Sequence, residues 1–282
     1  MNEHSRIPYS RFGKNRPGTV WLIGGPGPSL WMPLVSSLSE YYNIIIPDIL
    51  KSISKVKSSD SLLDPATILE MLKDSEEPVH LVGWSLGTSF SLAIFESAPE
   101  RFASMTWICG RPNRLRPTST STSASLRREV YFNLANMLPA AAGYMAAHAD
   151  RILRLQKKIV LLGSPARSAK RFGLLDPLTD DAAFDALVQE FLQIDSMRYR
   201  KYVDAVAHLS KEESPLNLSV PLLLVTGERD IFAPPKQLRP IVAEIPQCEY
   251  FEVISGTHYV PVEYGELLAL KLDDFFKRAV RK

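Results

Sequence analysis

The sequence predicts an α/β protein whose mostly parallel sheet is flanked by helices and interrupted by a helical insertion. Over residues 18–110, short apolar runs alternate with helical patterns, and this alternation is typical of βαβ units. The strand signal is largely lost over residues 111–215 and returns over residues 216–282. We therefore expect an α/β core formed by residues 1–110 and 216–282, with residues 111–215 as a helical cap inserted before the last strands.

The expected strands are short runs rich in Val, Ile, Leu or Trp: 19–23, 42–47, 79–84, 104–109, 221–226 and 249–254. Continuous apolar runs of this length are typical of parallel strands that are buried on both faces. Apolar residues at helical spacing predict helices at 31–40, 65–73, 88–97, 126–136, 140–155, 181–194, 196–208 and 263–277. Ligands of open α/β sheets bind at the carboxyl ends of the strands, so we expect the functional site in the loops there.

The overall composition excludes several classes of protein. Hydrophobic residues make up 45% and charged residues 23% of the 282 residues, which is ordinary globular composition. Two separated cysteines, Cys109 and Cys248, form neither a disulfide framework nor a cysteine-rich zinc site. No apolar run is long enough for a transmembrane helix, and the polar N-terminus predicts no secretory signal, so we expect a cytoplasmic protein. A net charge of +2 argues against nucleic-acid binding.

The strongest local motif is Gly83-Trp84-Ser85-Leu86-Gly87, which follows an apolar run and precedes a helical pattern. A serine at such a sharp strand-to-helix turn is exposed, and the flanking glycines give the turn steric room. The helix that follows directs its N-terminal partial positive charge at the site. The motif therefore predicts Ser85 as a nucleophile.

A serine nucleophile needs a base, and the base needs an orienting acid. His258 is the histidine that lies in a loop after a strand of the core, whereas the others lie in the N-terminal tail, a strand or the cap: His4, His80, His148 and His208. Asp230 follows the run 221–226, with Glu228 as a nearby competitor. The chain order Ser, Asp, His favours Asp230.

A glycine-rich loop, Gly24-Gly25-Pro26-Gly27, follows the first strand of the core. A backbone N–H of this loop would form half of an oxyanion hole, and the N–H of Leu86 would form the other half. No Gly-Lys-Ser/Thr follows, so the loop is not a phosphate-binding loop.

Taken together, these motifs resemble the α/β-hydrolase superfamily over residues 17–277. The matching segments are GGPG at 24–27, GWSLG at 83–87, APERF at 98–102, GERDIFAPP at 227–235 and GTHYVPVE at 256–263. The resemblance implies Ser85 as nucleophile, Asp230 as acid and His258 as base, with Gly25 and Leu86 as oxyanion donors. It implies cleavage of an ester or thioester through an acyl-enzyme, and neither a metal nor an organic cofactor.

Two positions depart from the superfamily's pattern. Ile23 replaces a histidine that often precedes the oxyanion loop, and no glycine follows Asp48, where the superfamily often has several. We expect Ile23 to change how the oxyanion loop is anchored, and we expect the loop after Asp48 to shape the pocket differently.

The expected cap contains a local excess of positive charge. Between residues 111 and 171 there are twelve Lys and Arg residues but two Asp and Glu residues. Arg151, Arg154 and Lys158 share one helix face, which is either a solvated face or a docking surface for an anionic partner. An acidic acyl carrier protein or an anionic lipid surface would fit. The chain is similar in this respect to the pimeloyl-[acyl-carrier-protein] methyl ester esterases.

Other functions stay open at this point. An acyltransferase or thioesterase would use the same three residues, and so would a C–C bond hydrolase or a haloperoxidase-like enzyme. GGPG hints at an aminopeptidase, but no clear acidic anchor for a substrate amine is visible. Ser85 excludes a haloalkane dehalogenase, whose nucleophile is Asp. A non-catalytic binding protein is disfavoured because all three catalytic residue types are present.

Overall fold

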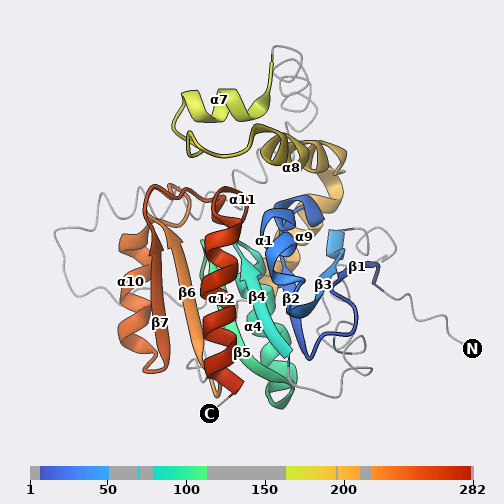
Figure 1. The fold of residues 1–282 in the computed structure, drawn as a ribbon, viewed down its shortest axis with the longest axis vertical. Coiled ribbons are helices and arrows are strands. Elements are labelled where there is room, and N and C mark those ends of the chain that lie inside the picture. Colours follow the sequence, from blue (N-terminus) through green and yellow to red (C-terminus); the bar gives the residue numbers. More distant parts are fainter. Residues whose placement is uncertain are drawn as a thin grey trace, which may run out of the picture.

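The computed structural model describes residues 7–50, 69, 79–112, 163–194, 196–209 and 218–280. Its centre is a seven-stranded sheet in the order β1-β3-β2-β4-β5-β6-β7 (Figure 1). The strands are β1 (Tyr9–Phe12), β2 (Gly18–Ile23), β3 (Tyr42–Pro47), β4 (Val79–Trp84), β5 (Phe102–Ile108), β6 (Leu222–Gly227) and β7 (Cys248–Val253). β1 pairs antiparallel with β3, and all the other pairs of neighbouring strands are parallel. The predicted fold class is therefore confirmed.

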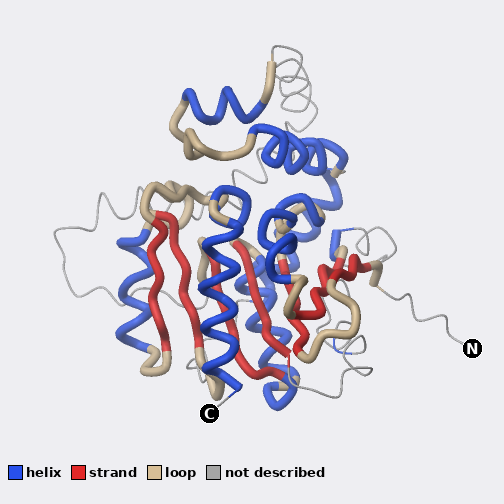
Figure 2. The backbone as a smooth tube through the Cα atoms, in the orientation of Figure 1, coloured by secondary structure: helices blue, strands red, loops and turns tan. Residues whose placement is uncertain are grey.

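Helices cover both faces of the sheet (Figure 2). One face packs against α1 (Met32–Leu38), α11 (Val260–Glu263) and α12 (Gly265–Val280). The other face packs against α4 (Gly87–Ser97), α9 (Ser196–Leu209) and α10 (Pro235–Glu244). Two further helices, α7 (Pro165–Arg171) and α8 (Asp181–Gln193), lie beyond the carboxyl ends of the strands in Figure 1. No helix among the described residues is long and apolar enough to cross a bilayer.

Burial on both faces explains why the parallel strands read as continuous apolar runs. In β2, Val20 and Leu22 belong to the apolar cluster of α1 and α12, whereas Trp21 and Ile23 belong to that of α4. All four side chains are fully buried. A strand buried on both faces has no polar positions, so its sequence does not alternate.

All six predicted strands are present, with ends within two residues of their predicted positions. β1, α7, α10 and the short helix α11 were not predicted. The helices expected at 126–136 and 140–155 lie outside the described residues, as does 65–73 apart from residue 69. α9, which the sequence assigned to the cap, packs through Tyr202, Ala205 and Val206 into the cluster that contains α4.

α12 forms a large part of one core cluster, so this helix offers a direct test of the packing. Leu272 is fully buried there, whereas Leu270, two residues earlier, is 71% exposed. Leu272→Ala should lower the free energy of unfolding by about 2–5 kcal/mol because it removes buried methyl groups and leaves a cavity. Leu270→Ala should change it little. Denaturant unfolding of both variants checks this, and equal losses would contradict the packing of α12.

His80 is a buried histidine near the start of β4, facing α12. Its Nδ1 lies 2.8 Å from the Ser104 hydroxyl on β5, and its ring stacks on Phe276 with 4.1 Å between centroids. Burial lowers the pKa of His80 to about 4. The residue is therefore neutral in the folded protein, and its position explains its presence without a catalytic role.

This burial predicts a pH dependence of stability. Below the ordinary pKa of about 6.5 the unfolded chain takes up a proton at His80 that the folded protein does not, so stability falls as the pH drops. The loss between pH 7 and pH 5 should be about 2 kcal/mol. His80→Gln should lack this contribution. Urea unfolding of both proteins at the two pH values checks it, and an equal pH dependence in the two would contradict it.

Candidate active site

Ser85 lies in the tight turn between β4 and α4, and its backbone is in the left-handed region with φ 53. Its N–H donates to the carbonyl of Ile108 at 3.0 Å, which anchors the turn to β5. Its own carbonyl accepts hydrogen bonds from the Thr88 N–H at 3.1 Å and the Thr88 hydroxyl at 2.7 Å. A non-glycine residue with this φ is strained, and the surrounding hydrogen bonds hold it in place.

Close backbone contacts explain the glycines of this motif. A Cβ atom at Gly87 would lie 2.2 Å from the carbonyl oxygen of Ile23, and a Cβ at Gly83 would lie 2.7 Å from that of Gly87. Any larger residue would push the turn away from β2 or from the helix. The same contacts bring the end of β2 against the start of α4.

The three residues predicted from the sequence meet at the carboxyl edge of the sheet. His258 Nε2 lies 3.0 Å from Ser85 Oγ, and His258 Nδ1 lies 2.9 and 3.1 Å from the two carboxylate oxygens of Asp230. Asp230 is 3% exposed and His258 is 8% exposed. A carboxylate only accepts hydrogen bonds, so Nδ1 carries the hydrogen and Nε2 is free to accept one from the serine hydroxyl.

The geometry distinguishes Asp230 from Glu228. The Glu228 carboxylate is exposed and accepts the N–H of Ser255 at 2.8 Å, next to the loop that carries His258. Asp230 Oδ1 also accepts the N–H groups of Phe232 and Ala233, both at 2.8 Å. These two donors fix the carboxylate so that it faces the imidazole.

Two residues that the sequence analysis did not single out hold the histidine loop. The indole N–H of Trp84 donates to the His258 carbonyl at 2.8 Å, and the two rings lie 5.0 Å apart. Glu263 of α11 accepts the Thr257 N–H at 2.7 Å and the Thr257 hydroxyl at 2.6 Å. Burial raises the pKa of Glu263. Trp84 and Glu263 both lie within motifs named above, GWSLG and GTHYVPVE. Their contacts could not be predicted from the spacing of residues in those motifs.

The glycine-rich loop has the conformation that its glycines allow. Gly24 has φ 118 and Gly25 has φ 82, and the Trp31 indole donates to the Gly24 carbonyl at 3.0 Å. Among the described residues, no acceptor is found for the N–H of Gly25 or of Leu86. An oxyanion site requires two N–H groups that have no acceptor within the protein, and in the described part of the chain these two fit that requirement.

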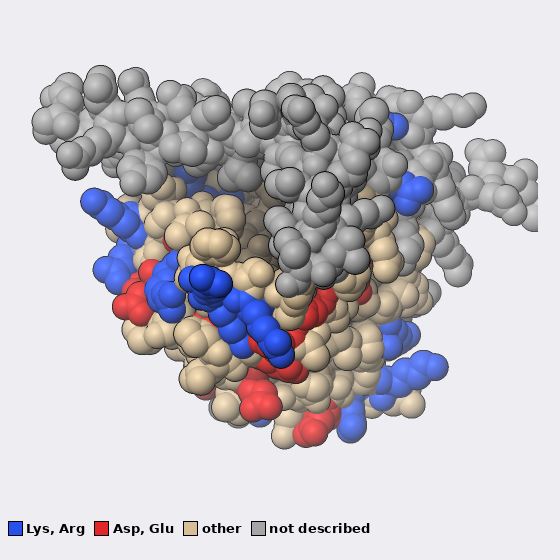
Figure 3. All heavy atoms as spheres, turned by 90° about the horizontal axis from the view of Figure 1, so that it is seen from above, with Lys and Arg blue, Asp and Glu red and all other residues tan. Residues whose placement is uncertain are grey.

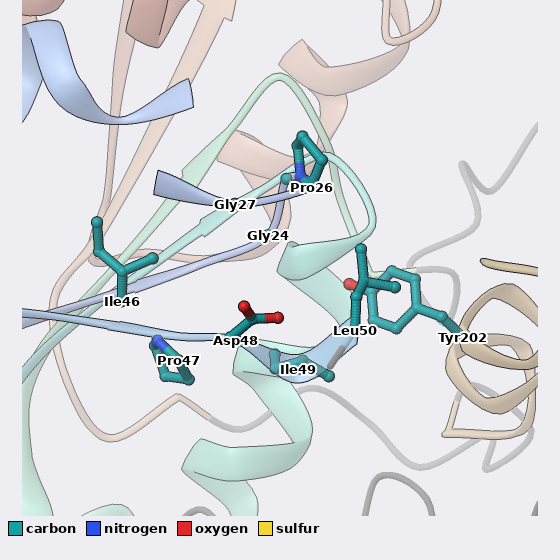
Figure 4. A pocket seen from close by; sticks show the side chains of 10 residues that line it. Gly24, Pro26, Gly27, Ile46, Pro47, Asp48, Ile49, Leu50 and Tyr202 are labelled. Atoms are coloured by element: carbon teal, nitrogen blue, oxygen red, sulfur yellow. The ribbon is translucent and has the colours of Figure 1, made fainter. Parts of the chain in front are cut away.

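A small cavity lies beside this loop (Figure 4). It is bounded by Gly24 to Gly27, by residues 46–50 at and after the end of β3, and by Tyr202 of α9, and Asp48 projects into it. Its volume of about 10 Å³ is close to the space that one water molecule needs.

One group of side chains in the described residues combines metal-binding atoms. A thiol, a carboxylate and an imidazole nitrogen lie within 4.8 Å of one another at Cys109, Asp230 and His258. Burial, followed by the charge of Asp230, raises the pKa of the Cys109 thiol well above its usual range. The thiol points to the Thr257 carbonyl at 3.6 Å. A metal ion here would have to displace the hydrogen bond between Asp230 and His258.

The segment of residues 163–194, which contains α7 and α8, carries several of its charges in ion pairs. Asp181 pairs with Arg167 at 3.3 Å and with Lys170 at 2.6 Å. Figure 3 shows Lys and Arg side chains beside Asp and Glu on this side of the molecule. The predicted docking residues Arg151, Arg154 and Lys158 lie outside the described residues.

Comparisons with known proteins agree with this architecture. A sequence model described as "alpha/beta hydrolase fold" matches residues 22–263. No curated protein sequence matches the chain. Among solved structures, an esterase from Thermogutta terrifontis shares 17% identity and a TM-score of 0.63, covering 97% of this chain and 93% of that one.

Two further structures show the same fold. A hydrolase from Oleispira antarctica has 15% identity and a TM-score of 0.64, covering 96% of this chain and 95% of that one. A serine hydrolase from Cycloclasticus zankles has 18% identity and a TM-score of 0.58, covering 95% and 94%.

The contacts of His258 predict different results for the two neighbouring acids. Asp230→Asn removes the charged acceptor of the Nδ1 hydrogen, so the downfield proton NMR signal of that hydrogen should disappear or shift strongly. Glu228→Gln, a matched change in the same loop, should leave it unchanged. The reverse pattern would mean that Glu228 orients the imidazole.

Proposed function

This chain belongs to the α/β-hydrolase fold family, and we propose that within it the chain acts as a serine hydrolase on a carboxylic ester or thioester. The observation that carries the proposal is the series of hydrogen bonds from Asp230 through His258 to Ser85. The buried acid, the imidazole and the strained serine turn form an arrangement suited to nucleophilic catalysis.

The first half of the reaction forms an acyl-enzyme. Ser85 Oγ attacks the carbonyl carbon while its proton passes to His258 Nε2, and Asp230 stabilises the imidazolium through Nδ1. The N–H groups of Gly25 and Leu86 donate to the oxyanion of the tetrahedral intermediate. When this intermediate collapses, the bond to the leaving group breaks, and Nε2 returns the proton to the departing alcohol or thiol.

The second half releases the acid. Water gives a proton to His258 Nε2 and attacks the acyl carbonyl, and the same two N–H groups stabilise the second oxyanion. Ser85 then leaves as the alcohol after it recovers the proton from Nε2. All these steps are carried by side chains and backbone groups of the chain itself.

The substrate would reach Ser85 beneath a cap. We propose residues 111–215 as the insertion that forms this cap. Within it, α9 packs against the core beside α4, whereas the described segment 163–194 contacts the glycine-rich loop and Glu263 of α11. An acyl group bound to a carrier protein, as in a pimeloyl-carrier methyl ester, would suit a cap in which Arg151, Arg154 and Lys158 form a basic face. An acyltransferase or thioesterase would use the same catalytic residues, with another acceptor in place of water or a thiol as the leaving group.

Ser85→Ala should lower the turnover of p-nitrophenyl esters at least about 10⁴-fold, because no other group then forms the acyl-enzyme. Labelling by a fluorophosphonate probe should be lost together with turnover. Ser97→Ala, which removes an exposed hydroxyl at the end of α4, serves as the matched control and should keep both. Turnover that survives in Ser85→Ala would refute the mechanism.

The wild-type protein distinguishes the alternatives in the same experiment. Labelling without turnover of simple esters would favour a specialised acyl donor, and an added alcohol or thiol would then reveal acyl transfer as a new ester or thioester product. Absence of both turnover and labelling would indicate a binding protein in which the three residues are catalytically silent.

A further inference from the structure

We propose that Glu190 is a positioning residue that holds the glycine-rich loop of residues 24–29 in its catalytic shape. Glu190 lies on α8, 161 residues away from the loop in sequence. This proposal rests on the proposed function, because it assigns Glu190 a role in placing the N–H of Gly25 against the oxyanion.

The contact between the helix and the loop is direct. Both carboxylate oxygens of Glu190 accept the N–H of Ser29, at 3.2 and 3.1 Å. Ser29 lies in η1 (Pro28–Leu30), a single turn of 3₁₀ helix, where the first N–H groups have no acceptor within the helix. A carboxylate accepting a backbone N–H forms a charge-assisted bond, which is about twice as strong as a neutral one.

The space around Gly27 shows that the carboxylate rests on the loop itself. A Cβ atom at Gly27 would lie 2.8 Å from the carboxyl carbon of Glu190 and 2.8 and 3.0 Å from its oxygens. The φ of Gly27 is 178, an extended value that any residue adopts, so conformational freedom does not explain this glycine. Its absence of a side chain is what lets Glu190 approach.

The loop is therefore held at two points with Gly25 between them. Trp31 donates to the Gly24 carbonyl on one side, and Glu190 accepts from Ser29 on the other. The first anchor belongs to the core, whereas the second reaches the loop from α8. The position of Gly25 consequently depends on where α8 sits.

The same helix also contacts the histidine loop. Phe184 of α8 packs edge-on against Tyr259, with ring centroids 5.1 Å apart, and Tyr259 follows His258 in the chain. A shift of α8 would thus disturb both the oxyanion loop and the base. An error of about 1 Å in the placement of a catalytic group can cost a factor of about 100 in rate.

The test compares two Glu190 variants with a matched control on the same helix. Asp185 also accepts a backbone N–H, that of Ala166 at 2.8 Å, but this bond stays within residues 163–194. Glu190→Ala should lower kcat about 10-fold or more and leave KM within about threefold, because the affected contact stabilises the transition state. Glu190→Gln keeps an acceptor oxygen and should recover most of the rate. Asp185→Ala should have wild-type kcat.

A second readout does not depend on activity. Amide hydrogen exchange in the peptide that covers residues 24–31 should be faster in Glu190→Ala than in the wild type or Asp185→Ala. This measurement tests the anchor even if the wild type proves inactive, so failure of the proposed function and failure of the anchor are distinguishable. An unchanged exchange rate in Glu190→Ala would overturn the proposal.

Two kinetic outcomes would also overturn it. A rise in KM alone would mean that Glu190 binds substrate and does not position the loop. An equal loss of kcat in Glu190→Ala and Asp185→Ala would mean that both act through the general stability of the α7–α8 segment.

Discussion

The strained turn at Ser85 is the constraint on which the rest of the site depends. A serine with φ 53 costs free energy, of the order of 1–3 kcal/mol, and it persists because β5, α4 and β2 all contact the turn. The turn needs glycines at 83 and 87, brings the end of β2 to the start of α4, and raises the serine oxygen above the carboxyl edge of the sheet. His258 and Asp230 are arranged beside that oxygen by loops at the same edge.

Charge burial is the second requirement of the site. Asp230 is almost completely buried, and its carboxylate receives the N–H groups of Phe232 and Ala233 as well as the imidazole. The raised pKa of Cys109 keeps a neutral thiol beside this carboxylate, so the two groups do not repel each other as anions. Glu263 of α11 accepts the N–H of Thr257, the residue before His258, and so connects the histidine loop to α11. These contacts fix the imidazole on its Nδ1 side, while Nε2 on the other side faces the serine.

The α7–α8 segment is attached to three of the chain segments around the proposed site. Glu190 accepts from the glycine-rich loop, the Asp176 N–H donates to Glu263 at 2.9 Å, and the Arg229 guanidinium donates to the Gly173 carbonyl at 3.5 Å. Because these contacts reach the oxyanion loop, the histidine loop and the acid loop separately, the segment connects parts of the chain that are far apart in sequence. A shift of this segment would therefore move several of these loops together.

The sequence by itself predicted the parallel sheet, the positions of six of its strands, and a serine, an aspartate and a histidine that the structure brings together. It could do so because strands buried on both faces leave continuous apolar runs, and the three residues lie in the loops that follow predicted strands. It did not reveal β1, a short edge strand with polar positions, or α10, which contains Pro240. Only the tertiary structure decided that Asp230 and not Glu228 faces His258. Both acids lie in one loop, and the sequence does not show in which direction each side chain points. The contacts of Trp84, Glu263 and Glu190 were likewise visible only there, because contacts across as many as 161 residues depend on how helices pack and not on any local spacing.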